Sequence, residues 1–358
     1  MPGDTLKDLP RSTTNKLIKR IETLPTHPTH QSVVQIALEE ALSTWRENET
    51  ANSLVILGKP IEGISQTLQE TLIIYKSEVL EILNPLPQSI QLTDSSAITA
   101  KLKQAFEPRA ASEDEHRGKR QIVVIPDLSW YFLRCVQGWE GVTYLRDLVM
   151  KDHSRFWLIG CNQWTWQYLS YVCQIDAYFE QVQQLPTVSG EEIQAWLAPI
   201  VEEIAIDFIE DESTKNGQKN KSESYFDRLG DLALGINAVA AQLWLYSLKY
   251  LSSDPEANSL KEEILGKIQH TTPTLPDLPK LTADDRYLLF SLLLHGQITL
   301  PCLALTLGET ESIVQSQVQM LLRSGVIWRQ RELLMVNPAH YPRLRWELVH
   351  NNFFIEED

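Results

Sequence analysis

The sequence lacks several features that would assign it directly to a class of protein. Its four cysteines form no C-x-x-C pair, which disfavours a zinc ribbon. Polar residues interrupt its apolar runs before they reach the roughly eighteen unbroken residues that a membrane-spanning helix needs. Residues 1–20 are polar and hold no apolar signal-peptide core. We therefore expect no transmembrane segment, reduced cysteines and a cytoplasmic location.

Positive charge is also in short supply. The chain carries 32 Lys and Arg residues against 47 Asp and Glu residues, which gives a formal net charge of −15. Such a surface repels a phosphate backbone unless the few cations are clustered. Nucleic acid is therefore disfavoured as a partner. The hydrophobic fraction of 43% is that of an ordinary globular protein with a real core.

Short apolar runs alternate with helical patterns in the first two thirds of the chain. The runs NSLVILG, QIVVIPDL and RFWLIGCN are each typical of a strand buried on both faces. A helical pattern, SQTLQETLIIYKSEVL, follows the first of them, and YFEQVQQLP predicts a short strand toward an edge. This alternation predicts an α/β fold with a parallel sheet.

Changes in composition divide the chain further. The segment 210–224 is polar and aperiodic, which is typical of disorder, and the segment 271–281 is proline-rich. After it, three helical patterns and a β-hairpin follow in the order of a winged helix. We therefore predict a flexible N-terminal arm (1–30), a P-loop NTPase-like α/β domain (31–200), a helical lid region (201–270) with a disordered insertion (210–224), a linker (271–281) and a winged-helix-like domain (282–358).

The turn after the first predicted strand carries the main functional signal. A phosphate-binding loop reads G-x-x-x-x-G-K-[ST] between a strand and a helix. Here the sequence GKPIEGIS keeps Gly58 and Gly63 at the right spacing, and Ser65 fills the position of a magnesium ligand. Ile64 replaces the lysine that would hold the β- and γ-phosphates, and Glu62 adds a negative charge. The pattern indicates a degenerate phosphate loop.

Three further residues complete the candidate site. Lys59 follows the first glycine and can supply part of the missing charge. Asp127, at the end of the second apolar run, is the candidate catalytic acid and, with Ser65, the candidate magnesium ligand. Asn162 ends the third run and is either a sensor of the γ-phosphate or a cap of the strand-end turn; the sequence leaves both open. No cofactor is assigned, and ATP or ADP with Mg²⁺ is the candidate.

Taken together, these motifs resemble the AAA+/STAND group of P-loop ATPases, and within it a bacterial, regulator-like branch in which the ATPase module precedes a C-terminal winged helix. The segments IPDLSWYFLRCVQGWEGVTYLRDLV and RFWLIGCNQWTWQYL are similar to the second acidic motif and the sensor strand of that branch. The resemblance covers roughly residues 35–355. It implies protein partners, namely an active ATPase homologue or further copies of the same chain.

The sequence departs from that group at three positions where the resemblance implies catalytic residues. Ile64 stands for the lysine, Pro126 for an acidic residue and Ala238 for the lid arginine. These departures favour a pseudo-ATPase that acts as a binding, assembly or regulatory subunit.

Two alternatives stay open. One is a weak but genuine ATPase that uses Lys59, Ser65 and Asp127. The other is a winged-helix DNA-binding regulator. Its recognition helix would span 309–324, where Arg323 is the one basic residue, whereas a DNA reader normally carries a basic face.

Overall fold

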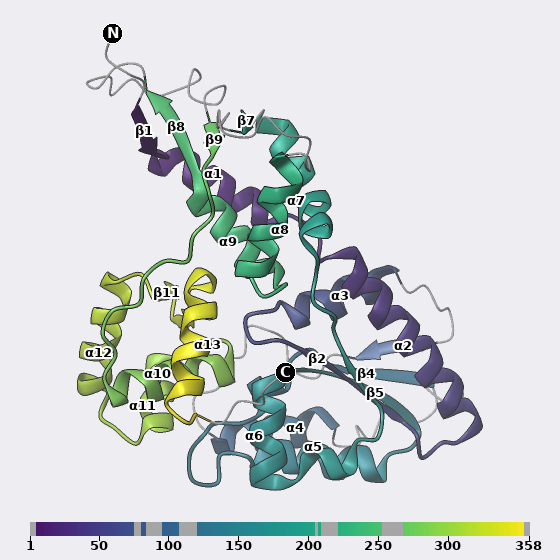
Figure 1. Ribbon diagram of the computed structural model, residues 1–358. Coiled ribbons are helices and arrows are strands. Elements are labelled where there is room, and N and C mark those ends of the chain that lie inside the picture. Colours follow the sequence, from purple (N-terminus) through teal and green to yellow (C-terminus); the bar gives the residue numbers. More distant parts are fainter. Residues whose placement is uncertain are drawn as a thin grey trace. The chain divides into compact units, whose positions relative to one another are not determined.

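The computed structural model describes residues 5–74, 80–83, 95–106, 120–204, 207–208, 221–252 and 268–353. The chain divides into two compact units, which we describe separately (Figure 1). The first unit comprises residues 1–27, 187–277 and 338–343. The second unit comprises residues 28–186, 278–337 and 344–358, and it contains the candidate site.

A five-stranded parallel sheet forms the centre of the second unit, with the strand order β3-β4-β5-β2-β6 (Figure 1). Its strands are β2 (Ser53–Gly58), β3 (Leu80–Leu83), β4 (Arg120–Ile125), β5 (Arg155–Asn162) and β6 (Val182–Gln184). The predicted parallel α/β sheet is confirmed, including the short edge strand. Since every pair is parallel, the carboxyl ends of β2, β4 and β5 meet at one edge of the sheet.

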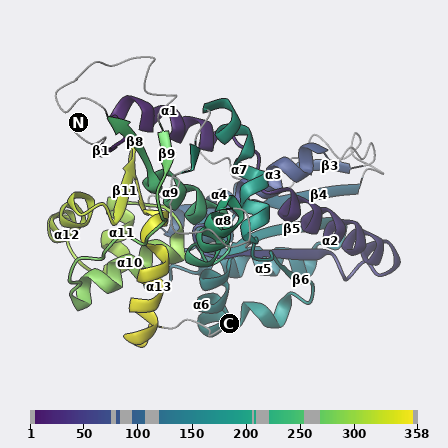
Figure 2. The same ribbon diagram turned by 45° about the horizontal axis from the view of Figure 1, so that its top comes forward.

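Helices cover both faces of this sheet. They are α2 (Pro28–Glu47) and α3 (Ile64–Ile74) on one face, and α4 (Ser95–Phe106), α5 (Glu140–Lys151) and α6 (Gln163–Cys173) on the other (Figure 2). Successive residues of β2 point to opposite faces: Leu54 and Ile56 pack under α2 and α3, whereas Val55 and Leu57 join the other core. An unbroken apolar run is therefore what a strand with two covered faces requires.

The helix predicted after the first strand was too long. The pattern SQTLQETLIIYKSEVL predicted one helix up to Leu80. In the structure α3 ends at Ile74, and Leu80 begins the parallel strand β3.

The segment 278–337 of the second unit contains the three helices α10, α11 and α12 and a small antiparallel sheet of order β10-β12-β11. Its elements are α10 (Ala283–His295), β10 (Ile298–Thr299), α11 (Leu300–Leu307), α12 (Glu311–Arg323), β11 (Ile327–Gln330) and β12 (Leu333–Val336). The chain continues with η4 (Pro338–His340), which belongs to the first unit, and with α13 (Tyr341–His350), whose residues from Leu344 on belong to the second. Helices and hairpin thus come in the order expected from the sequence. The assignment of this segment as a winged helix stays a proposal.

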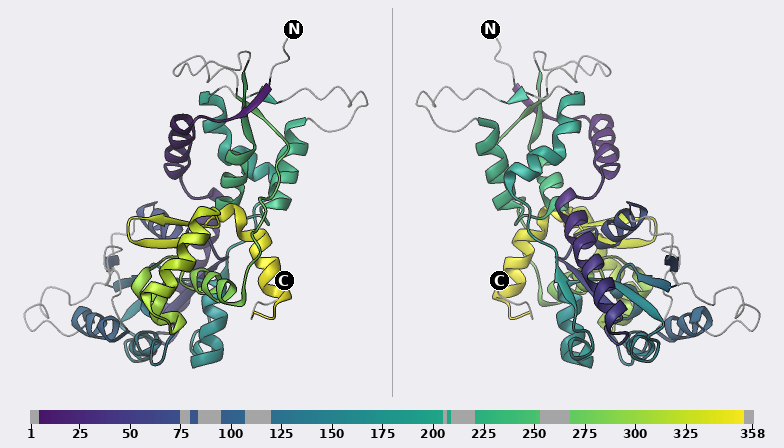
Figure 3. Two further views of the ribbon diagram at one scale, coloured as in Figure 1. Left: turned by 90° about the vertical axis from the view of Figure 1, so that its left-hand side faces the viewer. Right: turned by 90° about the vertical axis from the view of Figure 1, so that its right-hand side faces the viewer.

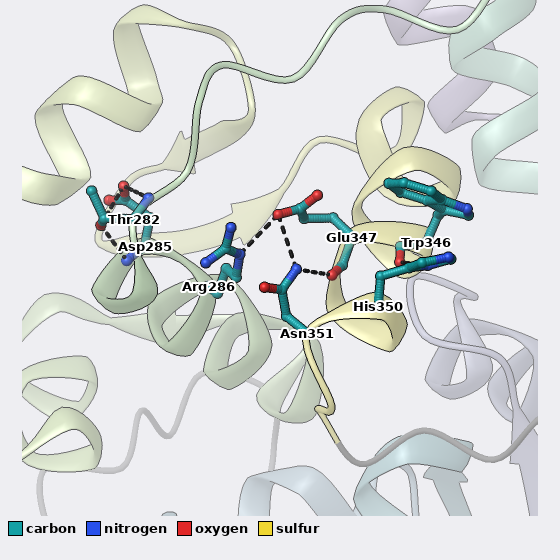
Figure 4. A network of polar contacts seen from close by, with 7 residues as sticks. All are labelled: Thr282, Asp285, Arg286, Trp346, Glu347, His350 and Asn351. Atoms are coloured by element: carbon teal, nitrogen blue, oxygen red, sulfur yellow. Dashed lines mark hydrogen bonds and ion pairs between the residues drawn. The ribbon is translucent and has the colours of Figure 1, made fainter.

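Helix α10 is anchored at its start and along its length (Figure 4). A capping box opens it, in which Asp285 N–H donates to Thr282 Oγ1 (3.1 Å) and Thr282 N–H donates to Asp285 Oδ2 (2.9 Å). One turn on, Arg286 Nε donates to Glu347 Oε1 of α13 at 2.8 Å, and Asn351 Nδ2 reaches the same oxygen at 3.2 Å. These contacts fix α13 against α10.

In its described residues, the first unit combines the helices α1, α7, α8 and α9 with a second small sheet of order β1-β8-β9-β7. Its elements are β1 (Thr5–Asp8), α1 (Arg11–Glu22), α7 (Gly190–Ile204), β7 (Asp207–Phe208), α8 (Lys221–Leu232), α9 (Asn237–Ser247), β8 (Leu248–Ser252) and β9 (Ile268–His270). Figure 3 shows β1, in purple, lying antiparallel against β8.

Two expectations are corrected in this unit. The predicted N-terminal arm, residues 1–30, was expected to be loose and to hold one helix; it holds the 12-residue helix α1 and also the strand β1, for which β8 supplies the hydrogen-bonding partners. The region 201–270 is not helical throughout, since β7, β8 and β9 lie in it. Most of the predicted insertion (residues 210–220) lies outside the described residues, and α8 begins at Lys221.

Candidate functional site

The sheet edge brings together the residues that the sequence singled out. The turn that starts at Gly58 leaves β2, Asp127 follows β4 by two residues, and Asn162 is the last residue of β5. In the register of the two neighbouring strands, Gly58 and Asn162 are Cα partners. The geometry therefore places the loop, the candidate acid and the candidate sensor along one edge. Whether they act as a nucleotide site stays a proposal.

The loop is closed by its own carboxylate. Glu62 Oε2 accepts a hydrogen bond from the backbone N–H of Lys59 at 2.5 Å, and the Glu62 side chain is only 5% exposed. A Cβ atom built on Gly58 would lie 3.2 Å from the same oxygen, so the carboxylate lies directly against the first glycine of the loop. In a working phosphate loop, backbone N–H groups of this kind donate hydrogen bonds to phosphate oxygens. Here one of them is already bound.

Burial has an electrostatic consequence for this carboxyl group. Desolvation raises the pKa of Glu62 to about 7, against the opposing effects of the Lys59 N–H hydrogen bond and the Lys59 charge. His30 Nε2 lies 3.9 Å from Glu62 Oε1 and 2.9 Å from the carbonyl oxygen of Pro186. The loop residue Ile61 has φ of 75°, a left-handed conformation that a β-branched residue rarely adopts.

The position of the missing lysine faces the protein core. Ile64 is the first residue of α3, is 2% exposed, and packs in the cluster with Leu68 and Ile56. It also lies close to β5, because a Cβ atom on Gly160 would be 3.2 Å from Ile64 Cγ1. The side chain at this position is therefore part of the hydrophobic contact between α3 and the sheet.

The remaining loop residues keep some capacity for binding. Ser65 is half-buried in the first turn of α3, and Gly63 is exposed just before it. Lys59 is half-buried, and its charge acts on Glu62.

Asp127 serves a local structural role. Its Oδ1 accepts the backbone N–H of Ser129 at 2.9 Å and thereby caps the short helix η1 (Leu128–Tyr131). Burial raises the pKa of Asp127 to about 6, although the hydrogen bonds from Ser129 lower it in part. Asp127 can ligate a metal ion only if its interaction with the ion outweighs the free-energy cost of ionising the buried carboxyl group.

Asn162 acts as a cap, which is one of the two roles that the sequence left open. Its Oδ1 accepts the backbone N–H of Thr165 at 3.0 Å and caps α6. Its Nδ2 donates to the carbonyl oxygens of Leu293 (2.9 Å) and Leu294 (3.1 Å), both in the last turn of α10. Every hydrogen-bonding group of the amide is thus engaged with the chain itself. No local sequence pattern indicates the contact with α10, whose residues lie about 130 positions away along the chain.

A cleft of about 550 Å³ runs along α6 and is lined mainly by glutamine and aromatic side chains, together with Leu57, Ser170 and Asp176. Within the described residues, no three His, Cys, Asp or Glu side chains cluster as a metal site. No helix in the described part of the chain is long and apolar enough to cross a membrane.

Comparison with known proteins gives similarity in structure alone. No family model matches the sequence, and no curated protein matches it. The chain is similar to Cdc6p from Pyrobaculum aerophilum (14% identity, 92% of this chain and 97% of that one, TM-score 0.38). It is also similar to the Aeropyrum pernix ORC2 protein, solved as ADPNP–ADP complexes (11% identity, 97% and 98% covered, TM-score 0.40).

A third similar structure is the Thermotoga maritima RuvB Holliday junction branch migration motor (12% identity, 89% of this chain and 95% of that one, TM-score 0.31). Identities and scores this low carry no weight of their own. The P-loop NTPase-like character of the fold rests on the parallel sheet and on the strand–turn–helix unit at β2 and α3.

Proposed function

We propose that this protein is a catalytically inactive AAA+-like P-loop protein that works as a binding, assembly or regulatory subunit. The observation that carries the proposal is the state of the loop: the Glu62 carboxylate binds the Lys59 N–H, and Ile64 is buried where a lysine would be needed. Both features weaken triphosphate binding at the loop, because one backbone donor is occupied and the lysine charge is absent.

Energies of single contacts indicate how much is missing. A hydrogen bond that involves an ionised group contributes roughly 1.5–3 kcal/mol, and the absent lysine would make such bonds to two phosphates. A phosphate oxygen that is to reach the Lys59 N–H must first displace the Glu62 carboxylate. Once ionised, that carboxylate also repels the polyanion at short range. Loss of attraction and added repulsion act in the same direction.

The engagement of Asn162 supports the same proposal. A residue that senses the γ-phosphate needs its polar atoms free to face the nucleotide, whereas both atoms of this amide are bound within the chain. Asp127 is likewise bound to a backbone N–H. Two residues that hydrolysis would need are therefore employed as helix caps.

Hydrolysis of MgATP by the purified full chain tests the proposal. We expect no turnover above that of the Asp127→Ala variant. Asp147→Ala is the control, because that aspartate lies on the exposed part of α5, where it pairs with Arg146. Turnover that Asp127→Ala abolishes and Asp147→Ala keeps would instead establish the weak ATPase that uses Lys59, Ser65 and Asp127.

Protein partners are part of the proposal, and they include an active ATPase homologue or further copies of this chain. The exposed face of α12 favours protein over DNA, because it combines Ile313 (49% exposed) and Met320 (61% exposed) with polar residues. On the hairpin of β11 and β12, Arg329 Nη2 lies 3.5 Å from Glu332 Oε2, so this cation is paired with a carboxylate. Duplex binding that weakens steeply with salt, and that is lost in Arg329→Ala, would favour the DNA-binding alternative.

A further inference from the structure

The last turn of α10 ends against the carboxyl edge of the parallel sheet. The final carbonyl groups of a helix have no partner within the helix and need donors from elsewhere. Three side chains of the α/β core supply them. Asn162 Nδ2 donates to Leu293 and Leu294, Thr165 Oγ1 donates to Leu294, and Ser129 Oγ donates to His295 at 3.3 Å.

These donors come from two of the loops that a nucleotide site would use. Ser129 lies two residues after the candidate acid Asp127, and Asn162 and Thr165 lie at the junction of β5 and α6. Asn162 and Thr165 are 6% and 0% exposed, so the hydrogen bonds are shielded from water. Breaking them would leave buried donors and acceptors unpaired, which is costly.

Aromatic contacts seal the same surface. The ring of Phe132, after η1, lies 4.7 Å from the ring of His295 between centroids, and both residues are buried. The ring centroids of Trp164 in α6 and Phe290 in α10 lie 6.0 Å apart. Beside them, Arg134 Nη2 donates to the carbonyl oxygen of Thr306 in α11 at 3.4 Å.

We propose that Asn162 is a positioning residue that fixes the C-terminal segment (residues 283–336) to the carboxyl edge of the sheet, so that this edge is a docking surface for α10. The segment, and with it the exposed face of α12, is held in place by the residue that would otherwise face a nucleotide. The proposal does not depend on catalytic inactivity, since it concerns what Asn162 binds and not whether ATP is turned over.

The chemistry of the amide allows a selective test. In Asn162→Asp, the Oδ1 acceptor that caps α6 is kept, and aspartate is as good an N-cap as asparagine. The donor is replaced by a carboxylate oxygen that faces the carbonyl oxygens of Leu293 and Leu294 and the negative end of the α10 dipole. The substitution therefore turns attraction into repulsion at the docking surface alone.

The chain offers a matched control in Asn52. This buried asparagine also donates through Nδ2 to two carbonyl oxygens at the end of a helix, those of Val149 (3.0 Å) and Asp152 (2.9 Å). Both lie at the end of α5, inside the α/β core. Asn52→Asp thus applies the same chemical change away from α10, and it separates loss of docking from general loss of stability.

Amide hydrogen exchange of the full-length variants measures the result. In Asn162→Asp we expect exchange in α10 and η1 to rise by roughly tenfold or more, the factor expected when hydrogen bonds between buried groups are lost. Asn52→Asp is expected to raise exchange in α5 without a rise of that size in α10. Equal protection of α10 in Asn162→Asp and the wild type, or equal loss in both variants, would overturn the proposal.

A milder variant covers the case in which Asn162→Asp fails to fold. Thr165→Val removes the hydroxyl that donates to Leu294 and keeps the shape of the side chain. We expect the same pattern with a smaller rise, roughly several-fold, in the last turn of α10. Unchanged exchange there would overturn the proposal as well.

Discussion

Replacement of Glu62 by glutamine tests the buried carboxyl group of the loop through the pH dependence of stability. Glutamine keeps an oxygen that can accept the Lys59 N–H, but it carries no charge at any pH. The pKa of Glu62 rises from 4.5 to about 7 in the folded protein. Each pKa unit corresponds to about 1.4 kcal/mol, so ionisation of Glu62 costs the folded state roughly 3 kcal/mol.

The sign follows from which state releases its proton first. Below pH 4.5 the carboxyl group is protonated in the folded and the unfolded chain, and it adds no pH dependence. Between pH 4.5 and about 7 only the unfolded chain has lost the proton, so the wild type loses stability as the pH rises. Above pH 7 the full cost is present. Glu62→Gln should therefore gain up to roughly 3 kcal/mol relative to the wild type between pH 4.5 and pH 8.

Guanidinium unfolding of both proteins at pH 4.5 and pH 8 gives this difference. Because the comparison is made at each pH, groups common to both proteins cancel. Glu40→Gln, at an exposed position of α2, controls for the loss of one charge. If the stability difference between Glu62→Gln and the wild type is the same at both pH values, the conclusion that the Glu62 carboxyl group is buried and hydrogen-bonded is refuted.

Three further predictions concern neighbouring residues. Asp127→Asn should gain up to about 3 kcal/mol over the wild type between pH 4 and pH 7, because the pKa of Asp127 is raised to about 6; a constant difference in unfolding midpoint contradicts this. Burial lowers the pKa of His295 to about 4, so the wild type loses stability as the pH falls from 6.5 to 4. In acid unfolding, His295→Phe should therefore lose less stability over this range than the wild type. Equal acid sensitivity of the two proteins would contradict a buried, neutral His295 ring. Thr282→Ala should cost about 1 kcal/mol in denaturant unfolding through loss of the capping box, whereas Asp284→Ala, at an exposed position, should cost less.

The sequence predicted those parts of the fold that depend on local patterns. The continuous apolar runs around Val55, Val123 and Ile159 indicated strands covered on both faces, and β2, β4 and β5 are such strands. The helices α10, α11 and α12 and the hairpin that follows them were equally readable, because helix starts, helical spacing and turn residues are local signals, whereas helix α13 (Tyr341–His350) was not predicted. Strand β3 was missed, since four residues that follow a helical run carry too little periodicity to be told from its continuation.

The candidate site was predictable in its position and not in its contacts. Spacing alone placed the loop at Gly58 and marked Ile64 as a departure. That Glu62 folds back onto the Lys59 N–H depends on the conformation of the loop, which single-residue patterns do not encode. The role of Asn162 depends on a contact with α10 that only the folded chain creates. Strand β1 was likewise unpredictable, because its partner β8 lies more than two hundred residues further along the chain.

Binding of MgATP to the wild-type chain, followed by isothermal titration calorimetry, tests the central claim most directly. We predict no saturable heat at millimolar nucleotide, because the loop offers an occupied N–H group and a buried isoleucine where a triphosphate needs free donors and a lysine. Saturable binding at micromolar concentration that ADP competes away would show that the loop still holds nucleotide, and it would contradict the account.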